Sequence, residues 1–276
     1  MHPPPASRAD AAAAAAGEPS PIGACPPTAD APPGPVLDRD LGPERTRADL
    51  AAEWLLTNGL GGYAMGTLPG VPTRRYHALL VAALRSPVGR HALLSAVVAE
   101  LRVGGASVPL STLRFDDDLL HPAGHERLRR FETDGLSCRW TWRLDDVSAG
   151  ARTTLELALA EGRNAAALTW RVSGMGNEGL LVVRPLVSIR DAHHLIEAPD
   201  ESVAVRARGA SVTVERFGIG LDLAMERGSF EADPDWWRGV RYDADEARGQ
   251  DCAEHLFCPG AFSTPIGGPG RDAVTL

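Results

Sequence analysis

Residues 136–147 read LSCRWTWRLDDV, and this stretch predicts the fold class. Cys138, Trp140 and Trp142 alternate with the charged Arg139 and Arg143. A two-residue period of this kind is typical of a β-strand with one buried face and one solvent-exposed face. Cys138 and the two large tryptophan side chains on one face require a second layer of structure to cover them.

Similar segments recur on both sides of this stretch, separated by turn residues. They are 78–84, 91–103, 106–112, 153–160, 166–173, 180–189, 202–208, 211–217 and 219–226. Short strands at a spacing of roughly ten residues, with no long helical period between them, favour an antiparallel arrangement. We therefore expect an all-β fold, a large antiparallel β-sandwich, with one short helical turn within residues 239–248.

Composition limits the function classes. The chain has 276 residues and a formal net charge of -8, and all of its basic residues are arginines, so we expect no nucleic-acid partner. No apolar run reaches membrane-spanning length, so we expect no membrane partner. The four cysteines lack disulfide-framework spacing, which favours reduced thiols and a cytoplasmic protein. Residues 1–48 contain half of the 22 prolines, and we expect a disordered tail there.

A glycine-rich stretch at residues 53–84 reads EWLLTNGLGGYAMGTLPGVPTRRYHALLVAAL. Its glycines and prolines are atypical of regular strands, so we expect an ordered polar loop that leads into the strand at 78–84. Two more polar segments interrupt the strand pattern. These are residues 190–194 (RDAHH) and residues 236–262, which are rich in aromatic, arginine and carboxylate side chains.

The residues do not support dinucleotide binding, metal binding or glycoside hydrolysis within this chain. Gly59, Gly61 and Ala64 match a dinucleotide fingerprint, but Gly66 and Pro69 prevent the helix that must follow it. The histidines and cysteines lack metal-ligand spacing, and adjacent aspartates do not imply the separated carboxylates of glycoside hydrolysis. The sequence alone thus gives no catalytic residue, no metal and no cofactor. The tryptophans divide into core candidates on strands (Trp140, Trp142, Trp170) and loop candidates for an interface (Trp54, Trp236, Trp237).

The glycine-rich stretch also carries a family resemblance. Residues 53–55, 57–64, 66–67 and 73–77 resemble the N-terminal domain of bacterial and archaeal glycogen debranching enzymes. Later stretches agree in order and spacing, namely 121–124, 184–194 and 248–260, so the resemblance covers residues 50–262.

The resemblance implies a β-sandwich of the supersandwich type found beside glucoamylase-like catalytic domains. It also implies an (α/α)6 catalytic domain that carries the catalytic carboxylates and hydrolyses α-1,6 linkages of branched α-glucans in glycogen catabolism. We expect a tail at 1–48, the sandwich at 49–262 and a separate Gly/Pro-rich end at 263–276. Since the chain ends at Leu276 without this catalytic domain, we expect a truncated form that does not act as an enzyme by itself.

The resulting hypothesis is a surface that docks on the (α/α)6 domain, or on a separate catalytic subunit, near its branched α-glucan substrate. Its expected residues are Trp54, Asn58, Gly61, Gly62, Tyr63, Arg74, Arg75, Tyr76, His77, Arg190, Asp191, His193, His194, Trp236 and Trp237. Two alternatives stay open. One is a stand-alone carbohydrate-binding module with Trp54, Trp236 and Trp237 as stacking platforms. The other is an inactive remnant that self-associates through its docking face.

Overall fold

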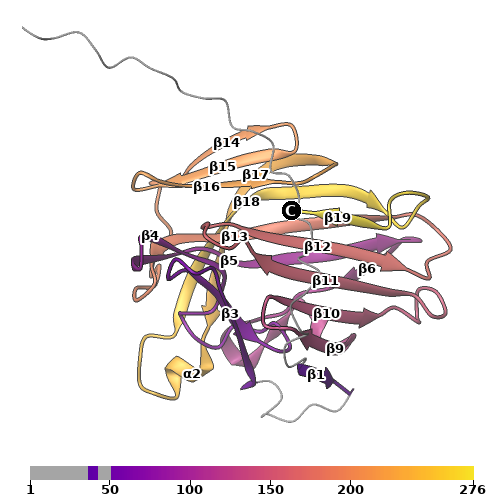
Figure 1. The fold of residues 1–276 in the computed structure, drawn as a ribbon, viewed down its shortest axis with the longest axis horizontal. Coiled ribbons are helices and arrows are strands. Elements are labelled where there is room, and N and C mark those ends of the chain that lie inside the picture. Colours follow the sequence, from indigo (N-terminus) through magenta and orange to yellow (C-terminus); the bar gives the residue numbers. More distant parts are fainter. Residues whose placement is uncertain (1–36, 43–50) are drawn as a thin grey trace, which may run out of the picture. The chain divides into compact units, whose positions relative to one another are not determined.

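The computed structural model describes residues 37–42 and 51–276, and nearly all of the regular structure in it is β-strand (Figure 1). This confirms the predicted all-β sandwich. The predicted disordered tail at 1–48 lies mostly outside the described residues. Within it, however, Leu37–Asp40 form strand β1, paired antiparallel with β9, so the prediction of disorder is wrong for these residues.

The first layer of the sandwich is a six-stranded antiparallel sheet. In spatial order it contains β1 (Leu37–Asp40), β9 (Leu128–Thr133), β10 (Ser137–Arg143), β11 (Arg152–Leu159), β12 (Ala166–Ser173) and β19 (Ala273–Thr275). Strand β10 is the strand predicted from LSCRWTWRLDDV. Cys138, Trp140 and Trp142 are buried and Arg139 and Arg143 are exposed, as the alternation predicts.

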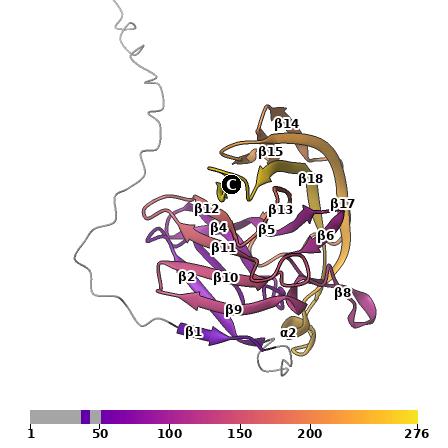
Figure 2. The ribbon, with the colours of Figure 1, turned by 90° about the vertical axis from the view of Figure 1, so that its right-hand side faces the viewer.

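The second layer is an eight-stranded sheet that wraps the opposite side of the core (Figure 2). In spatial order it contains β17 (Ser229–Arg241), β18 (Ala253–Ile266), β13 (Gly179–Asp191), β5 (Val88–Val103), β4 (Ala78–Arg85), β3 (Tyr63–Thr67) and β2 (Glu53–Thr57), with β6 (Ala106–Pro109) paired to β5.

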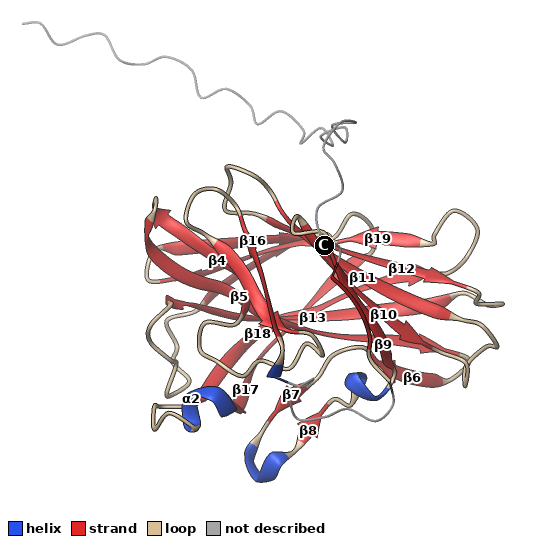
Figure 3. Ribbon diagram, turned by 60° about the horizontal axis from the view of Figure 1, so that its bottom comes forward, coloured by secondary structure: helices blue, strands red, loops and turns tan. Residues whose placement is uncertain are grey.

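Smaller elements complete the described part of the chain. They are a three-stranded sheet of β14 (Ala204–Arg208), β15 (Ser211–Arg216) and β16 (Ile219–Ala224), a two-stranded sheet of β7 (Leu113–Arg114) and β8 (Leu120–His121), the 3₁₀ turns η1 (Asp116–Asp118) and η2 (Gly124–Glu126), and the helix α2 (Asp243–Glu246). Figure 3 shows these helical turns on one side of the two large sheets. Helix α2 lies within the segment where a short helical turn was predicted. None of the described helices is long and apolar enough to cross a membrane.

The core between the two sheets is organised around tryptophans. Trp140 of the first sheet meets Trp54 of the second edge-on, with ring centroids 5.3 Å apart. The Trp140 Nε1–H donates to the Leu68 carbonyl oxygen at 2.8 Å, so its polar atom is satisfied inside the core. Trp54 was predicted to lie in a loop; that prediction is wrong, because Trp54 belongs to β2 and is only 6% exposed.

Strand β5 is buried on both faces, which explains why residues 92–99 are apolar except for the buried Ser95. Val97 and Ala99 belong to the core between the sheets. Ala96 and Val98 instead join a second buried cluster on the outer face of the eight-stranded sheet, together with Tyr242. The candidate site described below lies on this outer face.

The glycine-rich stretch is not one loop. It contains the hairpin of β2 and β3, joined by a turn in which Gly59 and Gly61 have positive φ. The prediction of a loop throughout is wrong because Gly59, Gly61 and Gly62 lie at the turn, and Gly66 is accommodated within strand β3. The prediction of the following strand β4 is confirmed.

The expectation that residues 236–262 lack strands is also wrong. Trp236 and Trp237 lie on β17, which pairs with β18 along most of its length. Register shifts between Ala232 and Asp235 and between Trp237 and Val240 interrupt the two-residue period. Such bulges remove the alternation that identifies a strand in a sequence.

The end of the described chain is part of the sandwich. Strand β18 continues to Ile266, and β19 pairs with β12 at the edge of the six-stranded sheet. Val274 is fully buried opposite Trp170. Leu276 forms two main-chain hydrogen bonds with Leu168, and each residue donates one of them. The sandwich therefore extends beyond residue 262, which was its predicted end.

We predict that Val274→Ala lowers the free energy of unfolding by about 2 kcal/mol, because it opens a cavity against Trp170. The exposed neighbour Asp272→Ala is the control and should change it by less than about 0.5 kcal/mol. Urea unfolding followed by tryptophan fluorescence measures both. Equal stability of the two variants would show that β19 contributes nothing to the core.

Candidate functional site

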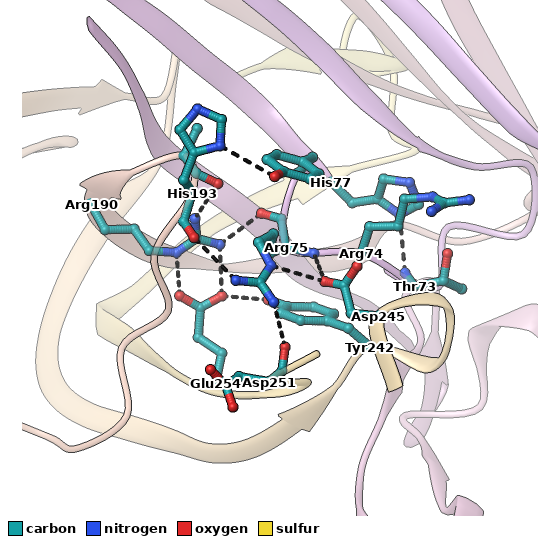
Figure 4. A network of polar contacts seen from close by, with 12 residues as sticks. Thr73, Arg74, Arg75, His77, Arg190, His193, Tyr242, Asp245, Asp251 and Glu254 are labelled. Atoms are coloured by element: carbon teal, nitrogen blue, oxygen red, sulfur yellow. Dashed lines mark hydrogen bonds and ion pairs between the residues drawn. The ribbon is translucent and has the colours of Figure 1, made fainter. Parts of the chain in front are cut away.

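A buried ion pair lies at the centre of the candidate site. Arg190, at the end of β13, donates through Nη2 to Glu254 Oε2 at 2.9 Å, and its Nε contacts Glu254 Oε1 (Figure 4). The side chains are only 4% and 0% exposed. Glu254 also accepts from the Tyr242 hydroxyl at 2.6 Å and from the Ile196 N–H at 3.2 Å. The remaining Arg190 donors reach the carbonyl oxygens of residues 75, 191 and 192.

Arg75 ties the loop before β4 to the same centre. Its main-chain N–H donates to Asp245 Oδ2 at 2.8 Å, and its Nε donates to the same oxygen at 3.3 Å. Its Nη1 donates to the His193 carbonyl oxygen at 3.1 Å, and its Nη2 donates to the Asp251 carbonyl oxygen at 2.8 Å. One side chain therefore links its own segment to two segments that are remote in sequence, at residue 193 and at residues 245–251.

Burial and charge act against each other in this centre. Burial alone lowers the pKa of Arg190, but the adjacent Glu254 carboxylate raises it above its ordinary value. Burial raises the pKa of Tyr242 well above its ordinary value, and Glu254 adds to that effect. Arg190 therefore stays charged and Tyr242 stays protonated, so both act as hydrogen-bond donors to Glu254.

His77 has a defined tautomer. Its Nδ1 accepts from the Thr73 N–H at 3.0 Å, so Nε2 carries the proton and lies 3.2 Å from Glu53 Oε1. Arg74 Nε contacts the same Glu53 oxygen. Burial lowers the pKa of His77 to about 4, against the opposing effect of Glu53, so the ring is neutral near pH 7.

The outward side of the centre carries aromatic and imidazole rings. The Tyr76 hydroxyl lies 3.2 Å from His193 Nδ1, and the two rings meet edge-on with centroids 5.6 Å apart. Tyr76 is half-buried, and His193 and His194 are exposed. Tyr63 and Tyr76 both pack on a small buried cluster that includes Ala192. We call Tyr63, Tyr76, His193 and His194 the ring surface.

Asn58 and the glycines of the β2–β3 turn perform an internal packing role. Asn58 is buried, and its Oδ1 accepts from the Leu60 and Gly62 N–H groups at 3.0 Å each. A Cβ on Gly61 would lie 2.5 Å from the Pro87 carbonyl oxygen, and one on Gly62 would lie 2.8 Å from the Val81 carbonyl oxygen. These glycines are therefore required by close packing within this chain.

The structure brings together nine of the fifteen sequence-predicted residues. Those gathered at the centre or on the ring surface are Tyr63, Arg74, Arg75, Tyr76, His77, Arg190, Asp191, His193 and His194. Trp54 lies in the core between the sheets. Trp236 packs on Phe257 at 5.3 Å and Trp237 lies 6.4 Å from Phe115, so both rings are partly covered by their own chain.

Sequence reasoning missed the acidic half of the centre. Glu53, Asp245 and Glu254 supply its carboxylates, and Tyr242 supplies a hydroxyl. A buried arginine requires a carboxylate partner, so the arginines near strand ends were the available signal. The sequence did not identify which of the many carboxylates in 236–262 forms an ion pair with each arginine. Within residues 37–42 and 51–276 no three His, Cys, Asp or Glu side chains converge as metal ligands would.

Comparison with known families gives one match. Residues 52–271 match the family model described as "Glycogen debranching enzyme N terminal". No curated protein matches the chain. The matched range includes the candidate site and both large sheets except β1 and β19.

We predict that Glu254→Gln lowers the free energy of unfolding by about 3–5 kcal/mol, because it leaves the Arg190 charge buried without its partner. The control is Glu231→Gln, an exposed carboxylate on β17, which should change stability by less than about 0.5 kcal/mol. Urea unfolding at pH 7 measures both. A loss below about 1 kcal/mol for Glu254→Gln would contradict a buried, charged pair.

We also predict a pH dependence of stability that depends on His77. Its folded-state pKa of about 4 is below the ordinary 6.5, so the unfolded chain binds a proton that the folded protein excludes. The free energy of unfolding should therefore fall by up to about 3 kcal/mol as pH decreases from about 6.5 towards 4. His77→Gln should reduce this drop, and the exposed control His194→Gln should keep it. Equal drops in the two variants would disprove the assignment.

Proposed function

Because the chain belongs to the glycogen debranching enzyme N-terminal family, we propose that it is the docking and substrate-side module of such an enzyme. In this proposal the ring surface contacts an (α/α)6 catalytic domain, on the same polypeptide or on a separate subunit. That domain supplies the acid and base carboxylates for hydrolysis of α-1,6 linkages in branched α-glucans. The sandwich shapes the substrate side of its active site and does not catalyse the reaction alone.

The observation that supports this proposal is the hydrogen-bond use of Arg75 and Arg190. Both side chains form several hydrogen bonds within the chain, so they hold the segments 73–77, 190–196 and 242–254 in one arrangement. The rings of Tyr76 and His193 are left at the surface of this rigid base. Pre-ordered aromatic side chains of this kind favour association because little conformational entropy is lost on binding.

The stacking-platform version of a stand-alone carbohydrate-binding module has less support. Trp54 is almost completely buried, and its Nε1–H donates to the Thr67 carbonyl oxygen at 3.0 Å. Its faces are therefore not accessible to a sugar ring. Trp236 and Trp237 follow each other on β17 and so point to opposite faces of the sheet, which does not form one platform.

We predict that Tyr76→Ala and His193→Ala each weaken association with the (α/α)6 domain by about tenfold or more. These changes keep the main-chain carbonyl of His193 that Arg75 uses. Titration calorimetry with the separately purified catalytic domain measures the affinity, and glucose release from a branched limit dextrin measures the functional effect.

The matched control is Phe217→Ala, which removes an aromatic side chain that is 72% exposed next to the β15–β16 turn. It should leave association and glucose release unchanged. The proposal fails if the ring-surface variants bind as tightly as the unmodified chain, or if Phe217→Ala is the variant that loses binding.

Light scattering of the chain alone tests the remnant alternative, which requires concentration-dependent self-association.

A further inference from the structure

A second polar site lies beside the centre described above. A pocket of about 210 Å³ is lined by Glu53 and Arg74, by Arg114 and Asp243, and by the apolar Val71 and Leu120. These residues come from the start of β2, the segment before β4, the β7–β8 sheet and helix α2. We call it the Arg74–Arg114 pocket. Its volume is below the range of about 300–1,000 Å³ typical of drug-sized ligands, which favours a smaller molecule.

Among the described residues, the charged side chains on the pocket wall are two arginines and two carboxylates. Arg74 Nε contacts Glu53 Oε1, and Arg114 Nε lies 2.9 Å from Asp243 Oδ1. Each positive group thus has a negative group beside it. An anion such as phosphate would meet two carboxylates, and a cation would meet two guanidinium groups. The pocket therefore favours a neutral ligand that uses both donors and acceptors.

Hydrogen-bond capacity separates these arginines from Arg75 and Arg190. Among the described residues, Arg74 donates only through Nε, and its Nη1 and Nη2 groups form no hydrogen bond. Arg114 donates through Nη1 to Asp118 Oδ1 at 2.7 Å, and its Nη2 forms none within the same residues. A guanidinium has five N–H donors, so the described residues leave most donors of both side chains without a hydrogen bond.

Glu53 likewise uses only one of its two carboxylate oxygens within the described residues. Both contacts to Glu53, from Arg74 and from His77, use Oε1, and Oε2 accepts no hydrogen bond from the described residues. The ion pairs hold these groups in position before a ligand arrives. Val71 and Leu120 add an apolar part of the wall. A pyranose ring matches this combination, because its hydroxyls donate and accept around the edge and its C–H groups form apolar faces.

We propose that the Arg74–Arg114 pocket binds one neutral pyranose unit, separately from any catalytic site. The class of ligand, a neutral polyhydroxylated ring, follows from the pocket itself. The choice of an α-glucosyl unit rests on the proposed function. Bound there, the sugar would use the spare guanidinium donors and Glu53 Oε2 and would place one face against Val71 and Leu120.

The test is an NMR titration of the ¹⁵N-labelled chain, with the Nε–H resonances of Arg74 and Arg114 as reporters. Methyl α-glucoside and maltose are the probes, and inorganic phosphate is the anionic comparison. We expect saturable shifts of both resonances with either sugar, at millimolar concentrations typical of small neutral ligands, and weaker or no binding of phosphate.

Leu120→Trp fills the pocket, and Leu119→Trp places the same side chain at a neighbouring position that is 57% exposed. Leu120→Trp should weaken sugar binding at least tenfold, and Leu119→Trp should retain it. Overlaid spectra of the remaining resonances verify that both variants are folded. The proposal is overturned by the absence of saturable shifts, by equal binding to both variants, or by tighter binding of phosphate than of sugar.

This experiment is independent of the docking experiment. Sugar binding without association to the (α/α)6 domain would support the pocket and contradict the proposed function. Association without sugar binding would support the proposed function and contradict the pocket proposal. If inositol, a neutral carbocyclic polyol, binds tighter than methyl α-glucoside, the assignment to a pyranose unit is overturned.

Discussion

The buried pair of Arg190 and Glu254 is the interaction on which the rest of the site depends. A charged arginine on the outer face of a sheet is costly to bury unless a carboxylate and several acceptors surround it. Here Glu254 and three main-chain carbonyl oxygens supply them, and Arg75 repeats the arrangement with Asp245. Because those partners come from three separate segments, satisfying the two charges fixes the segments relative to one another.

In this arrangement, the residues that stabilise the site differ from the residues at its surface. Arg75 and Arg190 carry the most hydrogen bonds, and all of these bonds are made to their own chain. The residues at the surface, Tyr76 and His193, form few bonds and are presented on a rigid base. Arg74 lies directly before Arg75 in the sequence and yet keeps most of its donors. Adjacent arginines thus have different roles, which their spacing in the sequence does not show.

The sequence predicted the fold well where strands have two different faces and poorly where they do not. The alternation of Cys138, Trp140 and Trp142 identified β10 directly, whereas bulges in β17 removed the same signal around Trp236. The family resemblance located the basic side of the site at residues 73–77 and 190–194. The partners Asp245 and Glu254 could not be assigned, because their pairing depends on how β17 and β18 return to the sheet. Trp54 was misplaced because the glycines that follow it suggested a loop.

We expect Arg75, Arg190 and their partners to form one rigid unit. The most direct measurement is native-state hydrogen exchange of the Arg75 and Ile196 amides, which donate to Asp245 and Glu254, compared with the Val183 amide in the core strand β13. If the unit is rigid, all three amides exchange only through global unfolding and report the same free energy. Exchange of the Arg75 and Ile196 amides through local opening, at several kcal/mol below the value for Val183, would contradict the account.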